Sequence, residues 1–230
     1  MAYCEPGRLL MFALSTGPHC RAARKMLDAL KAPYALLEVD LLSEPERARA
    51  LAELAHVNPA QTFPTLLVGG RAAAGPLTDD LRRLAVRFVR GSGQGAGPAE
   101  SFGPVAELPA AAKLHETLAP VQAAQGYVFN QDPSWTLKAL AGILVNEARY
   151  GYGSCPGRLA VGRPEGDRAI ICPCAFRAED VAKYGHCHCR LYFSPRAPGS
   201  KALPVPDRWL PPALRPGPPG LRPGPKIGGP

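Results

Sequence analysis

The cysteines of this 230-residue chain constrain it more than any other feature, because five of the seven lie between residues 155 and 189. They form one Cys-Pro step and two Cys-x-Cys triplets: Cys155, Cys172 with Cys174, and Cys187 with Cys189. Structural zinc sites usually leave about two to four residues between paired cysteines, so a single intervening residue argues against an ordinary zinc knuckle. Cysteine thiolates also hold iron–sulfur clusters, and four sulfurs converging from three short turns favour a cluster. A zinc site and unligated thiols remain the alternatives.

The composition predicts a globular chain without a membrane span. Hydrophobic residues make up 46% of the sequence, which is enough for packed cores. No apolar run approaches the roughly 18 residues that a spanning helix needs. The first residues lack the charged and apolar regions of a secretory signal. We therefore expect a cytoplasmic protein, in which thiols stay reduced and clustered cysteines serve metal binding or catalysis.

The formal net charge of +8 permits an acidic partner. Nucleic acid is one such partner, but the sequence has no helix-turn-helix, no RNP motif and no interleaving of aromatic and basic residues. A small acidic protein explains the sign of the charge equally well. We therefore expect neither nucleic acid nor a membrane as a partner.

Residues 1–91 have the pattern of an α/β domain. Short apolar stretches predict strands, and apolar residues at helical spacing predict helices. The order β-α-β-α-β-β-α suggests a small mixed sheet covered by helices. The expected strands are 8–14, 34–40, 65–68 and 71–74, and the expected helices are 18–31, 44–56 and 77–90.

This domain resembles glutaredoxin at two short motifs. The first is STGPHC at residues 15–20, after the first strand, and the second is TFPT at residues 62–65, before the third. The resemblance implies a thioredoxin-like fold, an active site at a helix N-terminus and a cis-proline at Pro64 beside that site. It also implies Pro64 and Thr65 as binding residues, with glutathione as a candidate cofactor. The attacking cysteine of the family is replaced here by Gly17.

Composition divides the remainder of the chain into three parts. Residues 92–111 are rich in glycine and small residues and are expected to form a flexible linker. Residues 112–212 are expected to form a second, mainly α-helical domain. Residues 213–230 are a Pro/Gly/Arg tail that we expect to be disordered. The elements expected in the second domain are helices over 114–124, 134–147 and 179–183 and a strand over 190–193.

The cysteine pattern of the second domain resembles the catalytic subunit of ferredoxin:thioredoxin reductase. That family carries CPC, CPC and CHC motifs, and the flanking words YGY, RLA, DRAII and LYF match as well. The resemblance implies a [4Fe-4S] cluster, a ferredoxin-type electron donor and thioredoxin or another disulfide protein as substrate. The cluster ligands that it implies are Cys155, Cys172, Cys174 and Cys187.

The same resemblance implies the residues that carry the chemistry beside the cluster. Cys189 would be the redox cysteine next to the cluster, and His188 would donate and accept protons, a task that suits an unperturbed histidine. The exposed attacking cysteine of the family is replaced here by Gly157.

Both motifs have therefore lost the attacking cysteine and kept its partner. Gly17 and Gly157 stand at the two attacking positions, whereas Cys20, the resolving thiol, and Cys189 remain. Decay to an inactive pair of domains is one interpretation, although decay would not be expected to spare every other cysteine. Engineering is a second. A third is that both positions are selenocysteine in the organism, translated here as glycine.

We expect an iron–sulfur disulfide reductase that passes electrons from a ferredoxin-type donor through the cluster to the tethered glutaredoxin-like domain and on to protein disulfides. A catalytically inactive iron–sulfur relay or binding protein is the alternative. A glutathione-dependent oxidoreductase with a structural zinc module is a third hypothesis. The basic face expected to dock the donor comprises Arg158, Arg163, Arg168 and Arg190.

Overall fold

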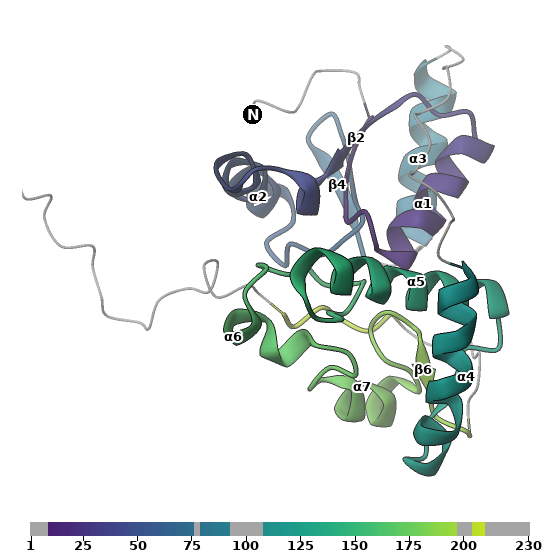
Figure 1. Cartoon of the computed structure of the whole chain (residues 1–230). Helices are drawn as coiled ribbons and strands as arrows, with labels where there is room; N and C mark the ends of the chain where they lie inside the picture. The colour runs from purple at the N-terminus through teal and green to yellow at the C-terminus, as the bar shows by residue number, and fades with distance from the viewer. Residues whose placement is uncertain (1–8, 76–78, 93–107, 197–203, 210–230) are drawn as a thin grey trace, which may run out of the picture.

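The structure is a computed structural model that describes residues 9–75, 79–92, 108–196 and 204–209 (Figure 1). Cys4, the tail over 213–230 and most of the expected linker lie outside these residues. Within the described residues, no helix combines the length and the apolar character needed to cross a membrane.

The first domain is built on a four-stranded mixed sheet in the order β2-β1-β3-β4. Strand β1 is parallel to β2 and antiparallel to β3, and β3 pairs with β4 as a hairpin. Every residue of β1 is buried, as expected for a central strand covered on both faces. The strands are β1 (Leu9–Ala13), β2 (Tyr34–Glu38), β3 (Thr65–Val68) and β4 (Arg71–Ala74).

Helices cover both faces of this sheet, with α1 and α3 on one side and α2 on the other (Figure 1). Ser43 and Glu46 form a capping box at the start of α2, which satisfies backbone N–H groups of its first turn. The helices are α1 (Pro18–Ala29), the 3-10 turn η1 (Val39–Leu41), α2 (Glu44–Val57) and α3 (Asp79–Ser92). The element order confirms the predicted thioredoxin-like fold.

The second domain is mainly helical, as predicted. Helix α5 begins at Asp132, whose carboxylate accepts hydrogen bonds from the N–H groups of Ser134 and Trp135, and ends at Gly151 with φ of 81°. The helices are α4 (Leu108–Ala124), α5 (Pro133–Tyr150), α6 (Pro164–Asp167), the 3-10 turn η2 (Arg168–Ile170) and α7 (Arg177–Tyr184). The antiparallel strands are β5 (Val128–Phe129) and β6 (Tyr192–Phe193).

Several element boundaries differ from the sequence-based expectation. Helix α4 begins at Leu108, inside the expected linker, because proline is tolerated in a first helical turn and alanines follow Pro109. The strand expected over 34–40 ends at Glu38, where the chain turns into η1. Arg190 has φ of 57°, a left-handed conformation incompatible with the strand expected there.

Each domain has its own hydrophobic cluster, and one residue crosses between them. Leu159 belongs by sequence to the second domain, yet it packs with the buried residues of the first. Residues 204–209 return across the second domain as a strap, anchored by the buried side chains of Val205 and Trp209. The Trp209 indole Nε1–H donates to the Leu159 carbonyl at 3.0 Å, so the strap and the domain contact are directly linked.

Candidate redox site

The cysteine of the first motif is enclosed at the start of α1. The Cys20 side chain is buried, and its Sγ accepts a hydrogen bond from the Leu14 N–H at 3.2 Å. Burial raises the pKa of the Cys20 thiol to about 12. Because the thiolate is the nucleophile, Cys20 as placed is a weak nucleophile at neutral pH.

Gly17 caps the same helix and faces Cys20. A Cβ atom built on Gly17 would lie 3.3 Å from the Cys20 Cβ and 2.9 Å from its Sγ. The Cβ atoms of disulfide-bonded cysteines are usually about 3.5–4.5 Å apart. With a shift of a few tenths of an ångström, a cysteine or selenocysteine at position 17 would therefore be placed to bond Cys20.

The second glutaredoxin-like motif lies at the start of β3. The Phe63–Pro64 peptide bond is cis, which confirms the expectation for Pro64. Thr65 is fully buried, donates to the Thr62 carbonyl at 2.7 Å and accepts from the Asn58 amide at 2.8 Å. Its hydroxyl is thus committed inside the domain, and glutathione binding there stays a prediction without structural support.

Backbone hydrogen bonds join the first two cysteine loops of the second domain and close the third. An isolated bridge between Ser154 and Ile171 joins the first loop to the second. The Cys172–Pro173 bond within the second loop is also cis. The bonds made by the cysteines are Cys155 N–H to Ile170 O (2.7 Å), Cys172 N–H to Gly153 O (2.9 Å) and Cys187 N–H to Tyr192 O (2.9 Å).

The thiols of these loops influence one another's ionisation. Burial, reinforced by the charges of Cys155, Cys187 and Cys174, raises the pKa of the Cys172 thiol well above its ordinary value. Burial opposes ionisation of Cys187 as well, but hydrogen bonds from the Cys189 thiol and the Tyr192 N–H outweigh it and lower its pKa. Burial and neighbouring thiolate charge raise the pKa of Cys174 as well, so a cation that takes up this charge would favour the ionised thiols.

The donor set matches that of a [4Fe-4S] cluster in kind. Such a cluster takes four cysteine thiolates, and five of the free cysteines lie in these loops. Within the described ranges, no three His, Cys, Asp or Glu side chains are positioned to hold one metal ion. The residues that would hold the cluster are Cys155, Cys172, Cys174 and Cys187.

A buried cation lies beside these thiols. The Arg158 side chain is fully buried, and its Nη1 has no hydrogen-bond partner. Its Nη2 is 3.5 Å from Asp180 and its Nε is 3.6 Å from Asp207. The expectation that Arg158 helps to dock a donor is therefore wrong: its neighbours are carboxylates and the cysteine loops, and it compensates buried charge.

Cys189 adjoins both the ligand set and the second glycine. Its Sγ lies 3.8 Å from the Cys187 Sγ, and its thiol also hydrogen bonds with Cys155. A Cβ built on Gly157 would lie 3.2 Å from the Cys189 Cβ. The Cβ spacing between Gly17 and Cys20 is thus repeated in the second domain, although the Cys189 Sγ, unlike that of Cys20, is not among the three atoms nearest to the added Cβ.

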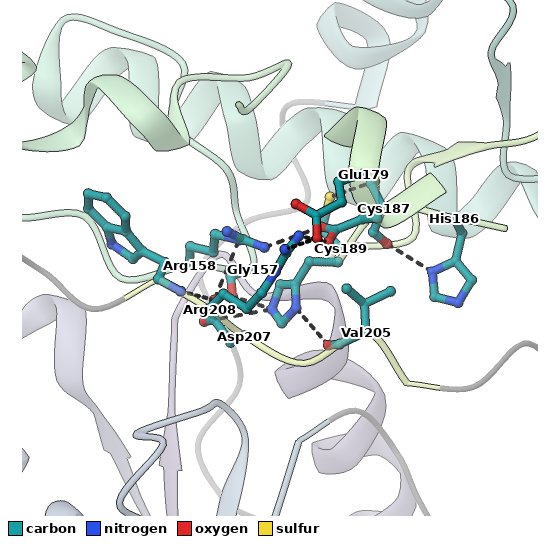
Figure 2. A network of polar contacts seen from close by, with 12 residues as sticks. Gly157, Arg158, Glu179, His186, Cys187, Cys189, Val205, Asp207 and Arg208 are labelled. Carbon is teal, nitrogen blue, oxygen red and sulfur yellow. Dashed lines mark hydrogen bonds and ion pairs between the residues drawn. The ribbon is translucent and has the colours of Figure 1, made fainter. Parts of the chain in front are cut away.

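The His188 ring lies between the carbonyl groups of Gly157 and Val205, two residues that Figure 2 labels. Its Nε2 is 3.1 Å from the Gly157 carbonyl and its Nδ1 is 3.1 Å from the Val205 carbonyl of the strap. Asp207 lies 3.9 Å from Nε2. Carbonyl groups only accept hydrogen bonds, so a ring with one proton satisfies one of them and a ring with two protons satisfies both.

The two candidate sites meet across the domain contact. The His19 Nε2 lies 3.0 Å from the His188 carbonyl, and the Thr16 hydroxyl donates to the Pro156 carbonyl at 3.4 Å. Burial, with the charge of His188, lowers the pKa of His19 to about 3, so its ring is neutral. A neutral ring with its proton on Nε2 can donate to the carbonyl. Gly17 and Gly157 are each one residue away from this contact.

Four contributors to the site were missed by sequence reasoning. Trp135 donates from its indole to the Cys189 carbonyl at 3.0 Å, and its ring packs on His19. Asp207 and Val205 come from the strap, which has no motif. For His19, its position inside the STGPHC motif was the available signal.

Comparison with known protein families finds two separate matching regions in the chain. The family described as ferredoxin thioredoxin reductase catalytic beta chain matches residues 107–203, and the glutaredoxin family matches residues 9–73. The chain therefore joins a glutaredoxin-like domain to a domain similar to the ferredoxin thioredoxin reductase catalytic chain. The strap over 204–209 lies just beyond the part that matches the reductase family. No curated protein matches the chain.

Solved structures similar to the chain are archaeal glutaredoxins. Methanoredoxin from Methanosarcina acetivorans is 30% identical, with a TM-score of 0.33, over 35% of this chain and 84% of that protein. Glutaredoxin from Methanosarcina mazei Go1 is 27% identical, with a TM-score of 0.32, over 35% and 78%. Glutaredoxin-1 from Archaeoglobus fulgidus is 23% identical, with a TM-score of 0.32, over 34% and 84%.

Proposed function

We propose that the chain is an iron–sulfur disulfide reductase whose reductase domain reduces its own glutaredoxin domain, which in turn reduces protein disulfides. Its two domains are typical of redox enzymes. One observation carries the specific proposal: Gly17 and Gly157 each face a buried cysteine at nearly disulfide spacing, and the two pairs meet at one interface.

The reaction follows thiol–disulfide exchange with a cysteine or selenocysteine at both glycine positions. The ionised group at 157 attacks the bond between 17 and Cys20, forms a bond to one atom of that pair and releases the other. Cys189 then attacks the group at 157, which frees the reduced glutaredoxin pair. Two electrons and two protons thus leave the 157–Cys189 pair, which ends as a disulfide or selenosulfide.

Two electrons from the donor and two protons restore that pair. A [4Fe-4S] cluster bound by the four cysteines would supply the electrons one at a time. Cys189 lies beside the ligand Cys187, and His188 lies against position 157, where its ring can give and take a proton. A selenol at both positions is our explanation for the glycines, and the genomic codons at 17 and 157 test it directly.

The alternative is an inactive relay or binding protein, which the two glycines themselves favour. Neither pair has an attacking group in the chain as written, and the remaining Cys20 is a buried, protonated thiol. We therefore expect this glycine-bearing protein to reduce disulfides poorly.

Replacing both glycines separates these functions. We expect the double variant Gly17→Cys with Gly157→Cys to reduce a thioredoxin-type disulfide with reduced ferredoxin, at least about a hundredfold faster than the parent, because covalent catalysis needs the nucleophile. Each single replacement is the control and should stay slow, since it restores one pair only. A double variant that holds its cluster but remains inactive would exclude the reductase and favour the inactive relay.

The cluster has its own test. Protein purified without oxygen should be brown, with about four irons per chain, and Cys172→Ser should lose colour and iron. Cys20→Ser is the matched control, because Cys20 lies in the other domain and should leave the iron unchanged. Colourless protein with stoichiometric zinc would disprove the cluster.

We further propose a ferredoxin-type donor, thioredoxin or another disulfide protein as substrate, and a cytoplasmic location. The exposed side chains of Arg163 and Arg168, near the cysteine loops, support an acidic donor. Glutathione remains a lesser candidate. A crevice between the domains, lined by Thr16, Asp40 and Tyr150 among others, has a volume of about 10 Å³. That is room for about one water molecule, whereas ligand pockets begin at roughly 300 Å³.

A further inference from the structure

The reductase face around position 157 is covered by the glutaredoxin domain. Pro156 and Gly157 on one side and Gly17 on the other are all buried. His19 and His188, which face each other across the contact, are 3% and 4% exposed. An outside protein therefore cannot reach either site while the domains are docked.

A glycine in the middle of α5 allows this close approach. A Cβ built on Gly142 would lie 2.8 Å from the Pro156 Cβ and 2.8 Å from the Thr16 carbonyl oxygen. Neither atom is the end of a flexible side chain, so a larger residue would force the two domains apart. Glycine inside a helix costs about 1 kcal/mol relative to alanine. The contact across the domains gives a reason for keeping it.

A charged contact at the end of α5 fixes the orientation of the docked domain. The Asp40 carboxylate accepts hydrogen bonds from the Ser15 N–H at 2.8 Å, the Ser15 hydroxyl at 2.5 Å and the Arg149 guanidinium at 2.7 Å. Its side chain is 6% exposed, so this pair is better shielded than a surface ion pair. Ser15 also accepts from Arg149 at 3.2 Å, so one arginine holds the residue that opens the STGPHC motif.

An apolar anchor completes the contact. Leu159, two residues after Gly157, is 5% exposed and packs into the hydrophobic cluster of the glutaredoxin domain. Its carbonyl is fixed by Trp209 of the strap. The surface therefore combines three features: the close approach at Gly142, the ion pair between Arg149 and Asp40, and the apolar contact of Leu159. Each of them contacts the glutaredoxin domain.

We propose that Gly142, Arg149 and Leu159 form a docking surface reserved for the chain's own glutaredoxin domain, which excludes outside disulfide proteins from the reductase site until it leaves. This rests on the proposed function, since it names the partner of that site. Docking and outside access are mutually exclusive because they use the same face. The glutaredoxin domain must therefore separate before it can meet its own substrate.

Hydrogen–deuterium exchange on the full, cluster-loaded chain tests the surface. In Gly142→Ala, amides over 14–20 and 156–160 should exchange at least about tenfold faster, the change expected when docking loses about 1.4 kcal/mol. Gly91→Ala is the matched control, because Gly91 is also helical but a Cβ there meets nothing within 4 Å. It should leave both segments unchanged.

Arg149→Glu provides a second route that does not crowd the helix. It should repel Asp40 and speed exchange in the same two segments, whereas Arg149→Lys should stay close to the parent. With an added lysine-reactive crosslinker, oxidised thioredoxin should crosslink to the reductase domain in Arg149→Glu and not in the parent. Parent-like exchange in both Gly142→Ala and Arg149→Glu, or crosslinking to the parent, would overturn the reserved surface. Protein without iron would instead overturn the proposed function and leave the exchange result valid.

Discussion

At the scale of single residues, Arg158 and Asp207 set the charge around the cysteine loops. Arg158 is a buried cation between two carboxylates and the thiols, and Asp207 contacts both Arg158 and His188. A positive charge nearby favours the more negative, reduced state of a redox centre. Losing the cation or its carboxylate partner should therefore shift the reduction potential in opposite directions.

We expect Arg158→Met to make the cluster's reduction potential more negative and Asp207→Asn to make it more positive, measured by redox titration with EPR detection. Arg158→Met should also destabilise the fold by roughly 3–5 kcal/mol, since it leaves Asp180 and Asp207 buried without their cation. Arg158→Lys keeps the charge and is the control for the potential. Shifts of the same sign in Arg158→Met and Asp207→Asn would contradict this charge balance.

At the scale of elements, helix α5 contributes residues both to the redox site and to the contact between the domains. Its N-cap carboxylate, Asp132, accepts from the N–H of Trp135 at 3.2 Å, and the Trp135 indole donates to the Cys189 carbonyl. Gly142 and Arg149 follow on the same helix. The start of α5 therefore positions the backbone of a redox cysteine.

Removing this cap should have a measurable cost. Asp132→Ala should lower the free energy of unfolding by about 1 kcal/mol, as measured by chemical denaturation, because two helix N–H groups lose their acceptor. Asp132→Asn can still accept from the same groups and should retain most of the stability. Equal losses in both variants would show that the carboxylate charge, rather than the hydrogen bond, stabilises α5.

At the scale of the whole molecule, one face of the reductase domain is occupied by the glutaredoxin domain, so the electron donor must approach elsewhere. The exposed Arg163 and Arg168 make a basic approach possible. We expect the rate of cluster reduction by ferredoxin to fall as salt rises, because charges are screened beyond about 8 Å at physiological ionic strength. Arg163→Glu with Arg168→Glu should slow reduction without loss of iron, and Arg83→Glu, on an exposed helix of the other domain, is the control. A rate insensitive to both salt and charge reversal would exclude this docking mode.

Local sequence was enough to predict most of the helices and strands. Hydrophobic periodicity predicted the alternation of strands and helices in the first domain and the mainly helical second domain. The short sequence motif at residues 62–65 predicted the cis-proline at Pro64. Both signals depend only on residues that are close together in the sequence. The cysteine spacing also identified the family of the second domain, because ligand spacing within short loops is a local property.

The contacts between the two domains and the burial of Arg158 could not be predicted from the sequence. The contact between Thr16 and Pro156 joins residues 140 positions apart, and no local pattern specifies it. Arg158 looked like a surface cation until its partners arrived from α7 and the strap. Gly142 looked like a weak point in a helix until the other domain came within 2.8 Å of its missing Cβ. The burial of a side chain and the distance between two domains depend on which distant segments of the chain pack together. They can therefore be seen only in the folded structure.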